Sequence, residues 1–199
     1  MKPAIIVIDM LKDSVTRDPS SQMAREARNI VPKIQELLGI GRKYGFPIVF
    51  ACDSFRTDDF IFKGRGKPTA IAGTEGAEII NELRPHRNEI ILKKRRLSAF
   101  FRTDLDLTLT RLKVDTIVLS GITTQFCVLA TAFDGISSDF SVIMVKDCCT
   151  CHRADFNDML MGMYQNTVLY PLLRVMEIHE LKEELECGSQ SDYSFSGTI

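Results

Sequence analysis

The sequence predicts an α/β fold, in which a doubly wound sheet of about six mainly parallel strands forms the middle of three layers, with helices on both faces. Two observations predict it. Short apolar runs rich in β-branched residues, such as residues 4–9 and 47–53, have the composition of parallel strands buried on both faces. Segments of helical composition, such as residues 20–44, separate these runs, and this alternation is typical of a Rossmann-like sheet.

The predicted elements follow one another in a regular order. In residues 20–44, apolar side chains recur at near-helical spacing, for example at Ala27, Ile30 and Ile34. Thr103, with Asp106 three residues later, resembles a helix-capping box. We expect strands at residues 4–9, 47–53, 89–94, 115–119 and 140–145 and within 168–176, helices at 20–44, 75–83, 103–112, 128–136, 154–164 and up to about 186, and a long loop at 54–74.

Length and composition indicate a single domain at residues 1–187, followed by a Ser-rich tail at residues 188–199. Of the 199 residues, 45% are hydrophobic and 26% are charged, which is ordinary for a globular protein. The formal net charge of −1 leaves no basic surplus to hold nucleic acid or an acidic membrane. No apolar run approaches the roughly 18 residues that a membrane span needs. We therefore expect neither nucleic acid nor a membrane as a partner.

The six cysteines are unevenly spaced, and the first residues run directly into a strand-like segment without a signal peptide. Both features predict a reducing, cytoplasmic location. The cluster of Cys148, Cys149, Cys151 and His152 also allows a metal site or the anion-binding loop of a sulfurtransferase. No second ligand set and no glycine completes either of these, so a strand-to-helix turn with incidental cysteines is the simpler interpretation. The role of the cluster stays open.

Polar and reactive side chains come at the ends of several predicted strands. Asp9, Asp53 and Lys94 end three of them, and Cys127 follows a fourth. In an open α/β sheet, ligands bind beyond the carboxyl ends of the strands, so these groups are candidates to meet at one edge. Each also has a simpler interpretation: Asp9 could turn the chain, and Lys94 could belong to a solvated basic run at residues 93–96.

Cys127 lies where a buried strand passes into a predicted helix. The free N–H groups and the dipole at a helix N-terminus should make its thiol ionise more easily than a free thiol, whose pKa is about 8.5. They could also hold an oxyanion. The alternative is that Cys127 is a small hydrophobic side chain that fills the interface between sheet and helix.

Three segments in register resemble one family, the isochorismatase-like cysteine hydrolases, which include nicotinamidases and N-carbamoylsarcosine amidase. Residues 4–10 are similar to the strand that ends in the family's catalytic Asp. Residues 94–105 are similar to its K-x-x-[YF]-S-A-F…T-D-L pattern, and residues 121–128 to G-[IV]-x-T-x-x-C-V. A weaker likeness lies at residues 73–78. The resemblance covers roughly residues 4–181 and implies the fold of that family.

The resemblance implies roles for particular residues. Cys127 would be the nucleophile, Asp9 the acid and base, and Lys94 the third member of a catalytic triad. The peptide between Ile122 and Thr123 would be cis, and the N–H groups of Thr123 and Cys127 would bind the oxyanion. The expected reaction is hydrolysis of a C–N bond in a small amide or N-carbamoyl compound through a thioester. The family likeness also implies a homo-oligomer, either a dimer or a tetramer.

Departures from the family pattern narrow the expected activity. Nicotinamidases hold a metal ion with an Asp and two His, but Phe55 and Thr69 occupy the two His positions here, so Asp53 alone cannot hold zinc. We therefore expect no metal and no other cofactor, and an activity like that of N-carbamoylsarcosine amidase. A nicotinamidase, an isochorismatase-type hydrolase and an inactive interaction protein on the same fold are the alternatives.

Two further residues are tentative substrate contacts. Phe55 could form a wall of the substrate pocket, and Arg102 could bind a substrate carboxylate through both ends of its guanidinium. Ordinary packing of Phe55 and exposure of Arg102 to solvent are the simpler alternatives.

Overall fold

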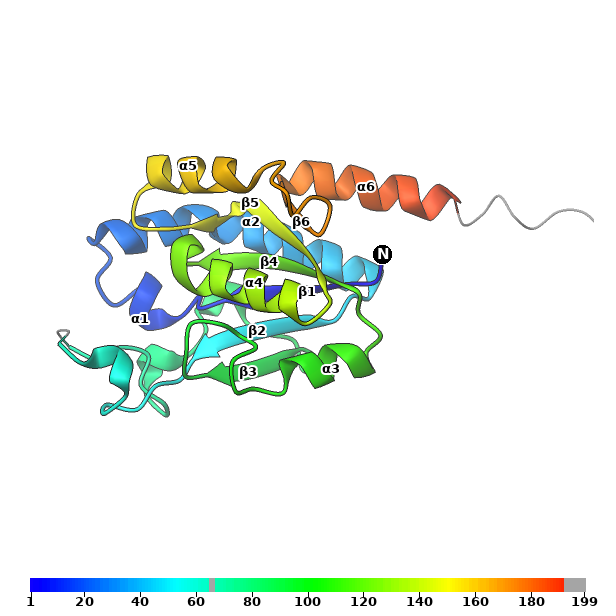
Figure 1. Cartoon of the computed structure of the whole chain (residues 1–199). Coiled ribbons are helices and arrows are strands. Elements are labelled where there is room, and N and C mark those ends of the chain that lie inside the picture. Colours follow the sequence, from blue (N-terminus) through cyan, green and yellow to red (C-terminus); the bar gives the residue numbers. More distant parts are fainter. Residues whose placement is uncertain (65–66, 192–199) are drawn as a thin grey trace, which may run out of the picture.

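The computed structural model of the chain describes residues 1–64 and 67–191, and it confirms the three-layer α/β fold (Figure 1). A single sheet of six parallel strands forms the middle layer, in the order β3-β2-β1-β4-β5-β6. This is the strand order of a Rossmann sheet. The strands are β1 (Pro3–Ile8), β2 (Ile48–Asp53), β3 (Ile90–Lys94), β4 (Thr116–Ile122), β5 (Ser141–Thr150) and β6 (Leu173–Met176).

Helices cover both faces because successive side chains of the buried strands point to opposite sides. Ile5 and Val7 of β1 belong to the core beneath α2, whereas Ile6 and Ile8 belong to the core beneath α3 and α4. Figure 1 shows α4 in front of the sheet and α2 behind it. The helices are α1 (Lys12–Val15), α2 (Gln22–Tyr44), α3 (Leu105–Arg111), α4 (Leu129–Ser137), α5 (Ala154–Tyr164) and α6 (Ile178–Ser191).

The order of the strands creates a crevice at one point of the sheet. The chain builds outward from β1 to β3 on one side, then returns to place β4 against β1 and builds outward on the other side. Ligands bind in α/β sheets at such a switch point, beyond the carboxyl ends of the strands. Here Asp9 follows β1, and Thr123 follows β4.

Two elements differ from the sequence prediction because long-range backbone hydrogen bonds override local preference. The helix expected at residues 75–83 is instead two short 3-10 turns, η2 (Glu75–Ala77) and η3 (Asn81–Leu83). Between them, Glu78 O accepts from Lys12 N and Ile80 N donates to Met10 O, each at about 3 Å, which holds this stretch extended against residues 10–12. The short helix α1 was not expected from the sequence.

The predicted capping box is also wrong. Asp104, not Thr103, is the N-cap residue of α3, and its side chain makes no capping hydrogen bond. The Thr103 hydroxyl accepts from Leu105 N at 3.3 Å and donates to Ala99 O at 2.6 Å, so it joins the first residue of the helix to the preceding loop.

Strand β5 is longer than the sequence predicts, and its pairing with β4 shifts register between Leu119 and Gly121. β5 runs to Thr150 rather than ending near residue 145, and its last part pairs with β4 through Gly121↔Cys149 and Ile122↔Thr150. Cys148 and Cys149 are therefore buried strand residues, not members of a turn. At the other boundary, α6 continues to Ser191, past the start of the tail expected at residue 188, and residues 192–199 of that tail lie outside the described residues.

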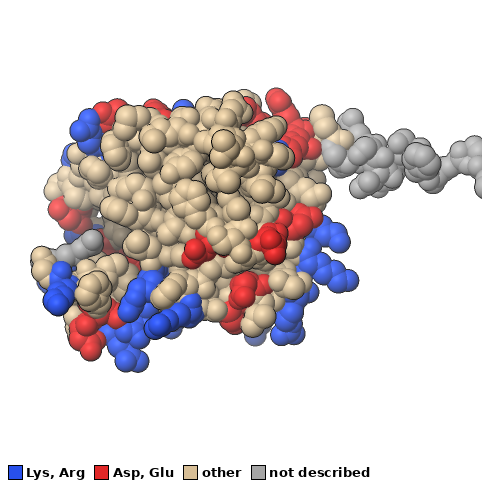
Figure 2. Space-filling view, in the orientation of Figure 1, with Lys and Arg blue, Asp and Glu red and all other residues tan. Residues whose placement is uncertain are grey.

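Charge is distributed unevenly on the surface that Figure 2 shows. Residues without charge form most of the surface over α4 and α5, whereas Lys and Arg gather below them in the view. Within the described ranges, every helix is too short or too polar to cross a membrane.

Gly121 joins β4 to β1 at the crevice, and its replacement tests this part of the fold. Its φ is +107°, and a Cβ atom there would lie 2.1 Å from Ile8 O. We expect Gly121→Ala to lower the free energy of unfolding by about 3 kcal/mol or more, because it adds both backbone strain and a clash. Urea denaturation measures the change.

The matched control is Gly39→Ala in α2, where an added Cβ meets nothing within 4 Å. It should raise the free energy of unfolding by about 0.5–1 kcal/mol, since Ala is the better helix residue. Equal effects of the two substitutions would contradict the close approach of β4 to β1.

Candidate active site

Asp9 turns the chain at the end of β1 and points its carboxylate into the crevice. Its φ is +53°, which is uncommon for a residue other than glycine, and its side chain is buried. Oδ1 accepts a hydrogen bond from the backbone N of Asp53 at 2.7 Å. Oδ2 lies 2.8 Å from Nζ of Lys94, and no hydrogen-bond donor of good geometry reaches it among the described residues. This oxygen is therefore free to accept a proton.

Lys94, the last residue of β3, is completely buried and joins two carboxylates. Its Nζ lies 2.5 Å from Asp53 Oδ1 and 2.8 Å from Asp9 Oδ2, and it donates to Arg96 O at 3.2 Å. Burial by itself would lower the pKa of Lys94, but the charges of Asp9 and Asp53 outweigh it and raise that pKa. Lys94 therefore stays an ammonium.

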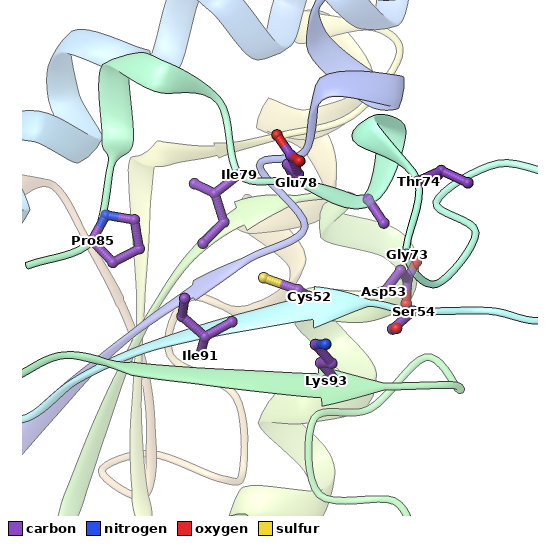
Figure 3. A pocket seen from close by; sticks show the side chains of 11 residues that line it. Cys52, Asp53, Ser54, Gly73, Thr74, Glu78, Ile79, Pro85, Ile91 and Lys93 are labelled. Carbon is purple, nitrogen blue, oxygen red and sulfur yellow. The ribbon is translucent and has the colours of Figure 1, made fainter. Parts of the chain in front are cut away.

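Strand alternation separates Lys94 from its neighbour Lys93. Lys93 faces a different hollow of about 350 Å³, which Cys52, Ile79 and Ile91 also line (Figure 3). The choice of Lys94 over Lys93 as the site residue thus agrees with the geometry. Cys52 lies on this other side as well, and burial raises the pKa of its thiol to about 12.

Cys127 lies within a π-helical turn, η4 (Thr124–Val128), that precedes α4. The prediction that Cys127 opens the helix is therefore wrong by one turn, because helical geometry begins at Thr124. A π turn of this kind is rare and is found most often at functional sites. The sulfur atom, a carboxylate oxygen of Asp9 and one of Asp53 all lie within 4.8 Å of one another. The structure thus brings Asp9, Lys94 and Cys127 together in one place.

The sequence predicts a Cys127 thiol that ionises easily, but its surroundings favour the neutral thiol. Burial raises the pKa of the thiol, and the charges of Asp9 and Asp53 raise it further, against the opposing charge of Lys94. The sequence prediction depended on the helix N-terminus and did not include burial or these two carboxylates. In the resting protein, Cys127 is a neutral thiol beside a carboxylate, so a base must take its proton before it can attack.

Two buried hydrogen-bonded networks hold the π turn, and sequence reasoning missed them both. The Thr124 hydroxyl donates to Asn157 Oδ1 at 2.6 Å, and Asn157 Nδ2 donates to Cys149 O at 3.2 Å. The Thr131 hydroxyl donates to Cys127 O at 2.7 Å and accepts from Ala99 N at 3.0 Å. Asn157, a polar residue among the apolar residues of α5, was the one feature of the sequence that could have indicated such a network. A buried amide needs hydrogen-bond partners.

The Ile122–Thr123 peptide is cis, at the position that the family resemblance implies. Thr123 O accepts from the N–H groups of Phe126 and Val128 at 3.0 and 3.3 Å. Ile122, Thr123 and Cys127 all line the crevice beside Asp9, so the backbone N–H groups of Thr123 and Cys127 are the candidate donors to an oxyanion.

These residues line a cavity of about 330 Å³, within the range of roughly 300–1,000 Å³ typical of small-molecule sites. Phe55 is buried in its wall, packed edge-on against Phe62 with ring centroids 5.3 Å apart. Arg102, the other tentative substrate contact, does not line it. Its guanidinium is exposed and lies 5.3 Å from the centre of the Phe101 ring, so the simpler alternative of a solvated arginine describes it.

Asp53 reaches the site, as its position at the end of a predicted strand indicated. The sequence assigned it no role in the reaction, and here it is the second partner of Lys94. Burial and then the charge of Asp9 raise the pKa of Asp53 to about 7, against the opposing effect of Lys94. The protonation state of the Asp53 carboxyl group therefore changes near neutral pH.

The residues present do not fit the metal ion of nicotinamidases. Phe55 and Thr69, which stand at the two His positions, both line the cavity, and Phe55 has no ligand atom. In the part of the chain that the structure describes, only Asp9, Asp53 and Cys127 bring potential ligand atoms of a metal close together. The ammonium of Lys94 already lies against both carboxylates, so its charge opposes a cation there.

Comparison with known proteins agrees with this geometry. Residues 3–173 match the family model described as the isochorismatase domain. An isochorismatase-like hydrolase from Alkaliphilus metalliredigens superposes with a TM-score of 0.82 at 30% identity and covers 93% of this chain and 100% of the other. N-Carbamoylsarcosine amidase from Thermoplasma acidophilum superposes with a TM-score of 0.78 at 29% identity over 89% and 96%. Maleamate amidohydrolase of Pseudomonas putida is 29% identical over 163 residues, 77% of this chain and 75% of the relative.

Replacing Asp53 by asparagine tests its coupling to the site. Below about pH 7, Asp53 becomes protonated and the Lys94 ammonium keeps only Asp9 as a charged partner, which changes the charge balance of the site. We therefore expect kcat/KM of the unmodified chain to fall as the pH decreases through about 7. Asp53→Asn should remove this step and lower kcat/KM at pH 8 by about ten-fold.

The matched control is Asp58→Asn, an exposed carboxylate in the loop after β2, which should leave the pH profile unchanged. A step near pH 7 that persists in Asp53→Asn would assign the titration to another group.

Proposed function

This chain belongs to the isochorismatase family, and we propose that it is a cysteine-dependent amidohydrolase that cleaves a C–N bond of a small amide or N-carbamoyl compound through a thioester. Members of this family are amidohydrolases that act on C–N bonds of amides, so the chain is a hydrolase of that class. One observation carries the finer proposal: Cys127 and Asp9 line one cavity, and the buried ammonium of Lys94 lies 2.8 Å from the Asp9 carboxylate.

The first half of the reaction uses Asp9 as a base. Oδ2 of Asp9 takes the thiol proton of Cys127 as the sulfur attacks the substrate carbonyl, because the raised pKa of the thiol keeps it neutral until then. The carbonyl oxygen becomes an oxyanion that the N–H groups of Thr123 and Cys127 hold. Asp9 then gives its proton to the nitrogen, the C–N bond breaks, and ammonia leaves.

The second half returns the site to its starting state. Asp9, again a carboxylate, takes a proton from water as the oxygen attacks the thioester, and the C–S bond breaks to release a carboxylic acid. Cys127 recovers its proton from Asp9. Amide and water thus give an acid and ammonia. Lys94 positions the Asp9 carboxylate throughout and offsets the negative charge that develops beside it.

Among the named activities, that of N-carbamoylsarcosine amidase is the one we favour. Phe55 and Thr69 in the cavity supply no imidazole for the metal site of a nicotinamidase, and the buried Cys127 beside Asp9 suits attack on a carbonyl carbon. The structural likeness to the Thermoplasma acidophilum enzyme supports this choice at the level of the family only, because the identity is 29%.

Two features of the proposal depend on the sequence and the family likeness alone. A cytoplasmic location follows from the free cysteines, and a homo-oligomer of two or four chains follows from the resemblance. Size-exclusion chromatography with light scattering measures the second directly.

Replacing the nucleophile tests the mechanism. Cys127→Ala should lower the rate of ammonia release from the best substrate of an amide and ureido-acid panel by about a thousand-fold or more, with little change in melting temperature. Acid quenching during turnover, followed by mass spectrometry, should find the acyl group on the peptide that contains Cys127. The control, Cys187→Ala, removes an exposed cysteine and should keep full activity. Turnover by Cys127→Ala would refute the assignment.

A chelator tests the absence of a metal step. Because the ammonium of Lys94 already contacts both carboxylates that an ion would need, incubation with EDTA followed by gel filtration should leave ammonia release unchanged within about 20%. Activity that is lost with EDTA and restored by zinc would show that a metal takes part after all.

A further inference from the structure

The catalytic cavity adjoins a second, larger hollow, which we call the vestibule. The vestibule has a volume of about 680 Å³, against about 330 Å³ for the cavity, and the two share Ile61, Leu97 and Phe126 as lining residues. Phe126 directly precedes the nucleophile in the chain, so the boundary between the two spaces lies next to Cys127. The vestibule is therefore the hollow that a substrate held at Cys127 would reach first if it extended past Phe126.

The walls of the vestibule are apolar and unusually exposed. Phe60, Phe101 and Phe126 line it with exposed fractions of 76%, 46% and 53%, and Leu97 is 40% exposed. Single exposed apolar side chains are normal on a protein surface, but a group of them around one hollow marks a binding surface. Aromatic walls of this kind favour an apolar chain or ring.

Positive charge lies beside these apolar walls. Lys63 and Arg96 also line the vestibule, against the single carboxylate of Asp134. The nearby Asp59 does not cancel them, because its buried carboxylate is held mainly by Arg95, whose hydrogen bonds keep the pKa of Asp59 well below its usual range. Arg96 makes only a long contact of 3.4 Å with Asp59. The outer part of the vestibule is thus suited to an anion.

We propose that the vestibule is a second substrate subsite, which accepts the remainder of an amide or N-carbamoyl substrate when that remainder is an apolar chain or ring ending in a carboxylate. This inference rests on the proposed function, since it places the scissile carbonyl at Cys127. Apolar atoms contact Phe126, Phe101 and Leu97, and the terminal carboxylate pairs with Arg96 and Lys63. The best substrates are then longer than the cavity alone would hold.

A homologous series of substrates tests the subsite. Monoamides of linear dicarboxylic acids, from succinamate to suberamate, are compared with neutral alkanamides of equal length by ammonia release. We expect kcat/KM to rise by about three- to four-fold per added methylene once the chain enters the vestibule, the effect of burying one methylene. At the longest chain, the carboxylate should add a further factor of about ten over the neutral amide.

Substitutions identify the residues that provide this preference. The double variant Arg96→Gln with Lys63→Gln should lower the ratio of kcat/KM for suberamate to kcat/KM for succinamate by about ten-fold, mostly through KM. The matched control, Arg111→Gln, removes an exposed charge at the end of α3, outside the vestibule, and should leave the ratio unchanged. Melting temperatures establish that each variant is folded.

A binding measurement separates failure of the subsite from failure of the proposed function. Calorimetric titration of the Cys127→Ala variant with suberamate and with octanamide requires no turnover, and suberamate should bind about ten-fold more tightly. If no amide is hydrolysed but this difference is present and Arg96→Gln removes it, the subsite stands and the proposed reaction fails. Rates and affinities that are independent of length and charge would overturn the subsite.

A second copy of the chain seated on the vestibule is the competing occupant. In that case, Phe126→Ala and Arg96→Gln would reduce the oligomeric state in light scattering, and kcat/KM would not change with the length of the substrate. This combination would also overturn the proposal. An unchanged oligomeric state in these variants, together with a kcat/KM that rises with chain length, supports it.

Discussion

The buried ammonium of Lys94 is the interaction on which the site depends. Moving a charged group out of water costs several kcal/mol, so Lys94 can be buried only because two carboxylates and a backbone carbonyl meet it. Those carboxylates come from the ends of β1 and β2, and the lysine comes from the end of β3. One electrostatic contact therefore ties three neighbouring strands together at the edge where the fold places its crevice.

The same contact determines what the thiol can do. A carboxylate pair bearing one ammonium has a net negative charge, and that charge together with burial keeps Cys127 protonated. A nucleophile of this kind is inactive until a substrate carbonyl arrives and Asp9 removes its proton. The arrangement differs from a thiolate–imidazolium pair, in which the cysteine is ionised at rest. It suits a chain whose cavity is lined by Asp9, Asp53 and Cys127 without a histidine.

Much of the fold could be predicted from the sequence because its strongest signals are local. Runs such as residues 4–8 of β1 bury both faces, and their continuous β-branched composition reveals this directly. Because the strands are parallel, Asp9, Lys94 and Cys127 all come to the same edge of the sheet. Their proximity could therefore be predicted from the topology, together with the resemblance to the family. For Arg102 the sequence left a substrate contact and a solvent-exposed side chain open, because a motif position does not determine the direction of a side chain; in the structure it lies over the Phe101 ring.

What could not be predicted depends on contacts between distant residues. The length of β5 is set by its pairing with the end of β4, and the 3-10 turns near residue 80 are set by hydrogen bonds to residues 10–12. The raised pKa of Cys127 is a sum over burial and three charges that are remote in the sequence. The place of Asp53 beside Lys94 is likewise a matter of geometry, since the sequence shows only that one former ligand has kept its carboxylate.

The hydrogen bonds of Asn157 have a consequence for how such proteins diversify. They fix the nucleophile turn from behind, through Thr124 and the backbone of β5, on the side away from the cavity. Neither of these hydrogen bonds involves a described residue of the loop that carries Phe55 and Phe60. Mutations in the loop can therefore change the substrate specificity while the sulfur of Cys127 keeps its position. In a fold of this kind, substitutions in the loop alone can produce activity on new substrates, while the catalytic residues and the elements that hold them stay the same.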